Sequence, residues 1–170
     1  LSGLVGSEMC IRDSFMRVSA DSPALPAPPS IVIDTNIALD LLVFEDPAWA
    51  PLAAVLAAGE LRWIATEPMR GELARVLRYP LIARRMAQRA LELPAVLADF
   101  DTRARLVEGV PKRASYVCSD PDDQMFVDLA VAHRARLLSK DKAVLSMRKR
   151  LGTLGVAAVS YTHLTLPTKA

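Results

Sequence analysis

Short apolar runs alternate with longer segments of helical periodicity along the middle of the chain. The run at 31–33 is β-branched throughout, and runs at 61–65, 136–139 and 156–160 predict three further buried strands. Between the runs, apolar residues recur every three or four positions, which predicts amphipathic helices. Strands that alternate with helices are typical of a parallel sheet. We therefore predict an α/β fold with three layers, α/β/α, around a central parallel sheet.

Capping residues, prolines and glycines set the expected helix limits. Thr66 and Asp120 are expected as N-caps, with Pro68 in one first turn and Pro121 in another. Gly59 is expected to close an earlier helix. The predicted helical segments are 35–43, 47–59, 66–79, 80–109 with a break near Pro94, 120–135 and 141–152.

The two ends differ in composition from the middle. Residues 1–15 and 161–170 resemble translated sequencing-adapter sequence, so we expect both to be non-native tails. Residues 16–30 are rich in proline and small residues and are expected to form a flexible leader. A single folded domain is predicted over 31–160.

Charge and cysteine content narrow the class of protein only a little. The formal net charge is +2, which neither indicates nor excludes a nucleic-acid binder. No apolar run reaches the roughly 18 residues of a membrane span. The two cysteines, Cys10 and Cys118, form no zinc or disulfide pattern, so a reducing cytoplasm is the expected compartment.

Four acidic residues occupy positions that helical and strand periodicity place near one edge of the sheet. Asp34 and Asp141 follow predicted strands, and ligands bind at the carboxyl ends of parallel strands. Glu72 lies on the inner side of its helix, and Asp123 lies in the first turn of another. Clustered carboxylates require protonation or cations, and hard ions such as Mg²⁺ or Mn²⁺ prefer oxygen ligands.

Each acid also has a structural explanation when it is considered alone. Asp34 and Asp141 would each cap the following helix, and Glu72 would be a paired surface residue. Asp123 would only complement a helix dipole. Asp40 is expected to be solvated or to end a helix, and His133 to be a core residue.

The ordered motifs "IVIDTN", "EPMRGELARVL", "CSDPDDQMFVDLAVAHRARLLSKD" and "VAAVS" resemble those of PIN-domain nucleases, in particular the prokaryotic branch described as toxins of type II toxin–antitoxin modules. The resemblance covers residues 31–160. It implies a metal-dependent ribonuclease that uses Mg²⁺ or Mn²⁺ to hydrolyse RNA phosphodiester bonds. It also implies a homodimer and a cognate antitoxin as partner.

The resemblance assigns roles to individual residues. Asp34, Glu72, Asp123 and Asp141 would be both metal ligands and catalytic acids. Asn36 would orient these carboxylates, and Thr35 and Ser139 would be polar rim residues. Gln124 stands where this branch often has a further aspartate, a departure that would weaken a second metal site.

An acidic centre repels RNA, so basic residues are expected to hold the substrate. The candidates are Arg75, Arg78, Lys140 and Lys142, and aromatic residues are too few for an extended base-stacking platform. A catalytically weak PIN domain that binds RNA or protein as a scaffold is the alternative function. A haloacid-dehalogenase-like phosphatase fits less well because Asn36 occupies the place of its second aspartate, and a phosphorylated receiver domain lacks its acidic pair.

Overall fold

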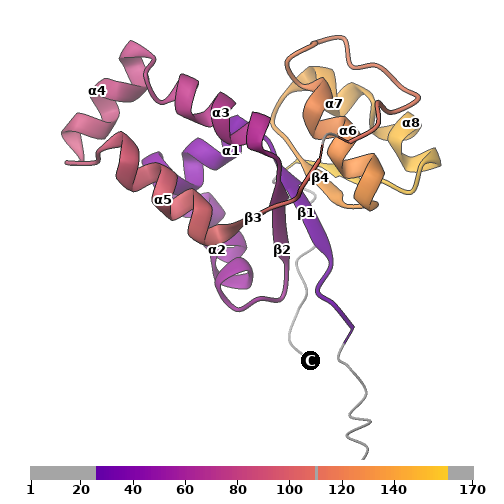
Figure 1. Cartoon of the computed structure of the whole chain (residues 1–170), viewed down its shortest axis with the longest axis horizontal. Coiled ribbons are helices and arrows are strands. Elements are labelled where there is room, and N and C mark those ends of the chain that lie inside the picture. The colour runs from indigo at the N-terminus through magenta and orange to yellow at the C-terminus, as the bar shows by residue number, and fades with distance from the viewer. Residues whose placement is uncertain (1–25, 110, 161–170) are drawn as a thin grey trace, which may run out of the picture.

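A five-stranded sheet, parallel throughout, forms the centre of the molecule (Figure 1). The structure is a computed structural model and describes residues 26–109 and 111–160. The expected tails at 1–15 and 161–170, and most of the leader, lie outside the described residues. The strands run in the order β3-β2-β1-β4-β5, so that β1 is central. Their bounds are β1 Ser30–Ile33, β2 Arg62–Ala65, β3 Ala104–Leu106, β4 Arg136–Leu138 and β5 Ala158–Val159.

Helices connect the strands and flank the sheet, which confirms the predicted α/β class. Figure 1 shows α1 to α5 gathered on one side of the strands and α6 to α8 on the other. A short π-helix continues α1, and a short 3₁₀ turn precedes α2. The bounds are α1 Thr35–Leu39, the π-helix Asp40–Phe44, the 3₁₀ turn Pro47–Trp49, α2 Ala50–Ala57, α3 Glu67–Val76, α4 Pro80–Gln88, α5 Leu93–Arg103, α6 Gln124–His133, α7 Lys142–Ser146 and α8 Arg148–Thr153.

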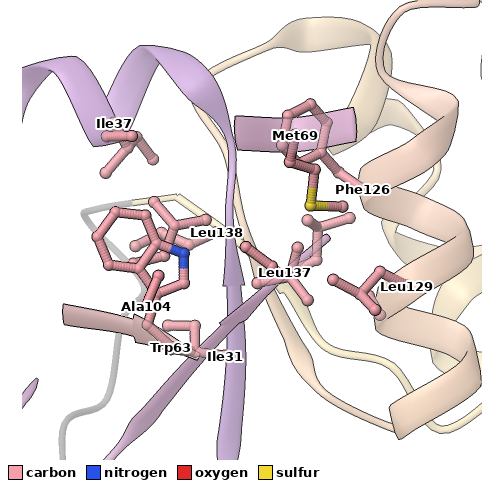
Figure 2. Close-up of a cluster of buried hydrophobic side chains, with 14 of the residues drawn as sticks. Ile31, Ile37, Trp63, Met69, Ala104, Phe126, Leu129, Leu137 and Leu138 are labelled. Carbon is pink, nitrogen blue, oxygen red and sulfur yellow. The ribbon is translucent and has the colours of Figure 1, made fainter. Parts of the chain in front are cut away.

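Alternating side chains of the central strands divide the core between the two faces of the sheet. Figure 2 shows Ile37 and Trp63 on one side of the strands and Leu129 with Leu137 on the other. The Trp63 ring meets Phe100 of α5 edge to face, with the ring centroids 5.1 Å apart. Helix α6 packs against β1 and β4. Because both faces are covered, β1, β2 and β4 are apolar and buried after their first residues, which are Ser30, Arg62 and Arg136.

Three expectations about secondary structure are wrong. Residues 104–106 form the edge strand β3, although they were expected to continue a helix. Helix α6 begins at Gln124 and not near Asp120, because Asp120 accepts a hydrogen bond from the Asp122 N–H within a preceding turn. The last predicted helix is two helices, α7 and α8, which meet at Met147.

His133 is exposed, so its expected core position is also wrong. It is the last residue of α6, and the next residue, Arg134, adopts a left-handed conformation with φ of 49°. Gly59, with φ of 71°, follows the end of α2 as expected.

Gln124 ties the loop before α6 to the helix itself. Its side-chain oxygen accepts from the Cys118 N–H at 2.6 Å, and its amide nitrogen donates to the Tyr116 carbonyl at 3.2 Å and to Asp128 at 2.7 Å. The Gln124 side chain is buried, and Asp128 also accepts from the Ala114 N–H at 2.8 Å. A buried amide with its donors and acceptor paired in this way fixes the position at which α6 begins.

We predict that Gln124→Met lowers the free energy of unfolding by about 2 kcal/mol, because it leaves buried polar partners unpaired. Gln88→Met, at an exposed position near the end of α4, should change it by less than about 0.5 kcal/mol. Denaturant unfolding measures both values. Equal effects of the two substitutions would mean that Gln124 does not hold the loop.

Candidate active site

Asp34 is a buried carboxylate at the end of β1, with 2 % of its surface exposed. One oxygen accepts from the Ile37 N–H at 2.9 Å and so caps α1. The other accepts from the Ser139 hydroxyl and from the Lys140 N–H at 3.3 Å. Burial raises the pKa of Asp34, and these hydrogen bonds oppose the rise. Asp34 can therefore cap α1 and also serve in the site, because one carboxylate has enough lone pairs for both roles.

Asp123 immediately precedes α6, and its carboxylate is incompletely satisfied. Its Oδ2 atom is buried and has no hydrogen-bond partner. Burial raises the pKa of Asp123 to about 7, and the negative charges of Asp141, Asp120, Asp34 and Asp122 add to the rise. A carboxylate surrounded by other carboxylates favours either a proton or a cation.

Glu72 lies on α3 and faces the same pocket, with 20 % of its side chain exposed. Arg75, one turn later, donates two hydrogen bonds to Glu72 Oε2, of which the Nε bond is 3.0 Å. The two interpretations of Glu72, as a site residue and as a paired residue, therefore each describe part of its environment, because it lines the pocket and is paired with Arg75. The hydrogen bond to Glu72 raises the pKa of Arg75.

Asp141 does not line the pocket that holds the other three acids. Its side chain caps α7 by accepting from the Ala143 N–H at 2.6 Å. The Ser139 hydroxyl accepts from the Asp141 N–H at 2.9 Å, and Ser139 is fully buried directly after the end of β4. Asp141 still makes the largest charge contribution to the raised pKa of Asp123, so it belongs to the same electrostatic site.

The pocket that joins these acids has a volume of about 540 Å³ and two chemically different sides. Thr35 and Asn36 line it beside Asp34, Glu72 and Asp123. The other side is apolar and was not predicted from the sequence. It consists of Leu39, Val76, Tyr79, Pro80, Leu81, Ile82 and Phe126.

Asp122 also lines the pocket, although helical periodicity over the predicted segment 120–135 points its side chain away from the face that carries Asp123 and Phe126. The helical projection fails because α6 begins after Asp123, so Asp122 lies in a turn. The sequence signal that would have found it is the acidic run around Pro121, read as a turn instead of a first helical turn.

Lys140 and Asp40 form an ion pair beside the site. The Lys140 ammonium contacts the Asp40 carboxylate at 2.5 Å, and Asp40 also accepts from the Trp49 indole at 2.9 Å. Asp40 is 7 % exposed, so it is not solvated, but it is the C-cap of α1, which agrees with its predicted place at a helix end. Since the Lys140 backbone also binds Asp34, residue 140 connects the end of β4 to the π-helix that starts at Asp40.

The four basic residues that were predicted to bind RNA differ in whether they already have a partner within the protein. Arg75 is paired with Glu72, and Arg78 donates to the Ala74 carbonyl at 2.7 Å. Lys140 is paired with Asp40, whereas Lys142 is an exposed residue at the start of α7. The Gln124 side chain hydrogen-bonds to the loop at 114–118. Its amide therefore stabilises the fold.

The side chains at this edge of the sheet carry the oxygen atoms that a hard divalent cation prefers. They would have to change position before they could bind one together. Asp34, Glu72 and Asp123 offer oxygen ligands, and the buried Oδ2 of Asp123 has no partner within the protein. Among residues 26–109 and 111–160, no three Asp, Glu, His or Cys side chains already stand in the arrangement of a metal site. The Glu72–Arg75 pair provides a physical reason, because it draws one carboxylate toward the arginine.

Comparison with known proteins identifies the family of this chain. None of the curated proteins matches the chain significantly. The profile of the PIN domain family matches residues 30–143, a span that begins at β1 and ends just after Asp141 and so contains all four predicted acids. The chain belongs to the PIN domain family.

Proposed function

We propose that this protein is a metal-dependent endoribonuclease that hydrolyses RNA phosphodiester bonds. PIN domains are typically metal-dependent nucleases. The single observation that carries the proposal is the buried, unpaired Oδ2 of Asp123 in a pocket shared with Asp34 and Glu72. A carboxylate group of this kind stores unfavourable charge that a divalent cation would neutralise.

The residues of the chain divide the work as follows in this proposal. Asp34, Glu72, Asp123 and Asp141 would hold Mg²⁺ or Mn²⁺. Such an ion supplies an activated water and stabilises charge on the phosphate. Asp34 would be the fixed member, because three hydrogen bonds orient it.

The polar and basic residues would complete the site. Ser139 would position Asp34, and Thr35 and Asn36 would contact the substrate phosphate or the carboxylates from the pocket wall. Arg75, Arg78, Lys140 and Lys142 would neutralise the flanking RNA backbone. The RNA backbone would therefore compete with Glu72 for Arg75 and with Asp40 for Lys140.

We further propose, from the resemblance to the toxin branch, that the protein is the toxin of a toxin–antitoxin module, acting in the cytoplasm as a homodimer. A cognate antitoxin would then cover the pocket. No helix in the described part of the chain is long and apolar enough to cross a membrane.

We predict that labelled structured RNA is cleaved with Mn²⁺ or Mg²⁺ and not with EDTA. Asp34→Asn and Asp123→Asn should each reduce the rate on the order of 100-fold or more, because each removes a charge from the metal site. Asp99→Asn removes a partly exposed acid of α5, which is paired with Arg103 and lies outside the pocket, and this variant should cleave normally. Cleavage that survives both pocket substitutions would refute this site, and metal binding without cleavage would support the scaffold alternative.

We predict that divalent cations stabilise the protein through Asp123. Mn²⁺ at about 100 times its dissociation constant should add roughly 2.7 kcal/mol to the free energy of unfolding. The rise in Tm should be much smaller in Asp123→Asn and unchanged in Asp99→Asn, as thermal scans with and without Mn²⁺ would show. An equal rise in all three proteins would place the cation elsewhere.

We predict that, without divalent cations, stability falls as pH rises from about 4 to about 7. The folded pKa of Asp123 is about 7, above its ordinary value of 3.8, so the folded state binds the proton more tightly than the unfolded state across this window. Asp123→Asn should therefore be more stable than the unsubstituted protein at about pH 8, by about 1–2 kcal/mol after allowance for solvent screening of this half-buried group.

The gain should shrink at about pH 5, where Asp123 is already protonated in the folded protein. Denaturant unfolding at the two pH values measures it. A gain that is the same at both values would mean that the Asp123 carboxylate is not strained by its neighbours.

A further inference from the structure

Large exposed apolar side chains gather at one side of the acidic pocket. Tyr79 is 44 % exposed and Leu81 is 81 % exposed, and both line the pocket that holds Asp34 and Asp123. The other exposed large hydrophobic residues of the described chain, Leu106 and Val117, lie outside this pocket. Exposed apolar side chains that lie together beside polar residues are typical of a binding surface.

A chain of contacts connects the acids to this ring. Arg75 is bound to Glu72 on one side, and on the other its guanidinium carbon lies 5.9 Å from the centroid of the Tyr79 ring. That distance is at the outer limit of a cation–π contact, so Arg75 does not pack closely on the ring. Glu72 and Tyr79 therefore line one wall of the pocket, and Arg75, which does not line it, contacts both of them.

A nucleotide has the chemistry that matches this wall. Its phosphate would lie toward the acids and their cation, and its base offers a flat apolar face. The volume of about 540 Å³ is within the range that holds a small organic group. Tyr79 lies at the start of α4, where the main chain holds it rigidly: its carbonyl accepts from the Ala83 N–H at 2.8 Å.

We propose that Tyr79, supported by Leu81, stacks on an unpaired nucleobase of the RNA next to the phosphate that is cleaved. This inference rests on the proposed nuclease function and adds a substrate preference to it. A base is free to stack on a protein ring only where it is not already stacked in a duplex, so single-stranded RNA is the preferred substrate. Stacking is tolerant of base identity, so little sequence preference is expected. One ring suffices for one base, although the chain has too few aromatic residues for an extended platform.

The test measures RNA binding in a chain that carries Asp123→Asn, so that cleavage does not interfere. The probe is a labelled single-stranded RNA of about twelve nucleotides, followed by fluorescence anisotropy. Adding Tyr79→Ala should weaken binding roughly tenfold, since stacking contributes about that much per base. Tyr79→Phe keeps the ring, and Val117→Ala removes an exposed apolar side chain outside the pocket. Both should stay within about twofold of the parent.

A sugar–phosphate oligomer of the same length without bases separates stacking from backbone contacts. The parent should bind it more weakly than the RNA, and Tyr79→Ala should remove most of that difference. Unchanged RNA affinity in Tyr79→Ala, or an equal loss for both oligomers, would overturn the inference. So would unchanged RNA affinity together with a change in oligomeric state by light scattering, since Tyr79 would then be a protein contact.

The observations that would contradict the proposed nuclease function differ from those that would contradict the role of Tyr79. Absence of metal-dependent cleavage and of a Mn²⁺-induced rise in Tm in the protein without substitutions would count against the nuclease. The comparison of Tyr79 variants is made in a chain that is not required to cleave, so its outcome is independent of those measurements.

Discussion

The arrangement of the site depends on one buried carboxylate, that of Asp34. Its two oxygens bind the start of α1, through the Ile37 N–H, and the end of β4, through Ser139 and the Lys140 N–H. A charged group with so little exposure is tolerated only when such partners compensate for lost water. The parallel pairing of β1 with β4, in which Ile33 lies opposite Leu138, brings these partners into reach. The same contacts that make the carboxylate tolerable therefore fix the edge of the sheet on which the other acids converge.

Much of this could be predicted from the sequence because strand ends and helix faces are local properties. The β-branched run at 31–33 and the Leu137–Leu138 pair place Asp34 and Asp141 at strand ends, and parallel topology brings strand ends together. Glu72 follows from the buried stripe of Met69, Leu73 and Leu77. These inferences need only periodicity and the rule that parallel sheets bind ligands at their carboxyl edge.

The remainder depends on pairings between distant residues, which periodicity does not encode. Asp40 is buried because Lys140, a hundred positions later, reaches it. The start of α6 depends on Gln124 bonding to a loop that has no regular structure of its own. Because α6 begins at Gln124 and not at Asp120 as predicted, Asp122 lies in a turn and lines the pocket, whereas the predicted helix would point it outward. The apolar side of the pocket was missed for a related reason, since Tyr79 and Leu81 lie where α3 ends and α4 begins, and neither helix alone defines that surface.

The distribution of charge at this pocket would couple the binding of a cation to the binding of RNA. The nearby cations Arg75 and Lys140 are each already bound to an acid, so they offset Glu72 and Asp40 and leave Asp34, Asp122 and Asp123 uncompensated by ion pairs among the described residues. A phosphate that approaches this edge meets net negative charge, whereas a divalent cation meets the attraction of several carboxylates. If the site works as a nuclease, a bound cation therefore strengthens binding of the substrate, and the substrate strengthens binding of the cation. Without the cation, the uncharged wall around Tyr79 is the part of the pocket that does not repel RNA, which explains why an apolar surface would be useful beside an acidic one.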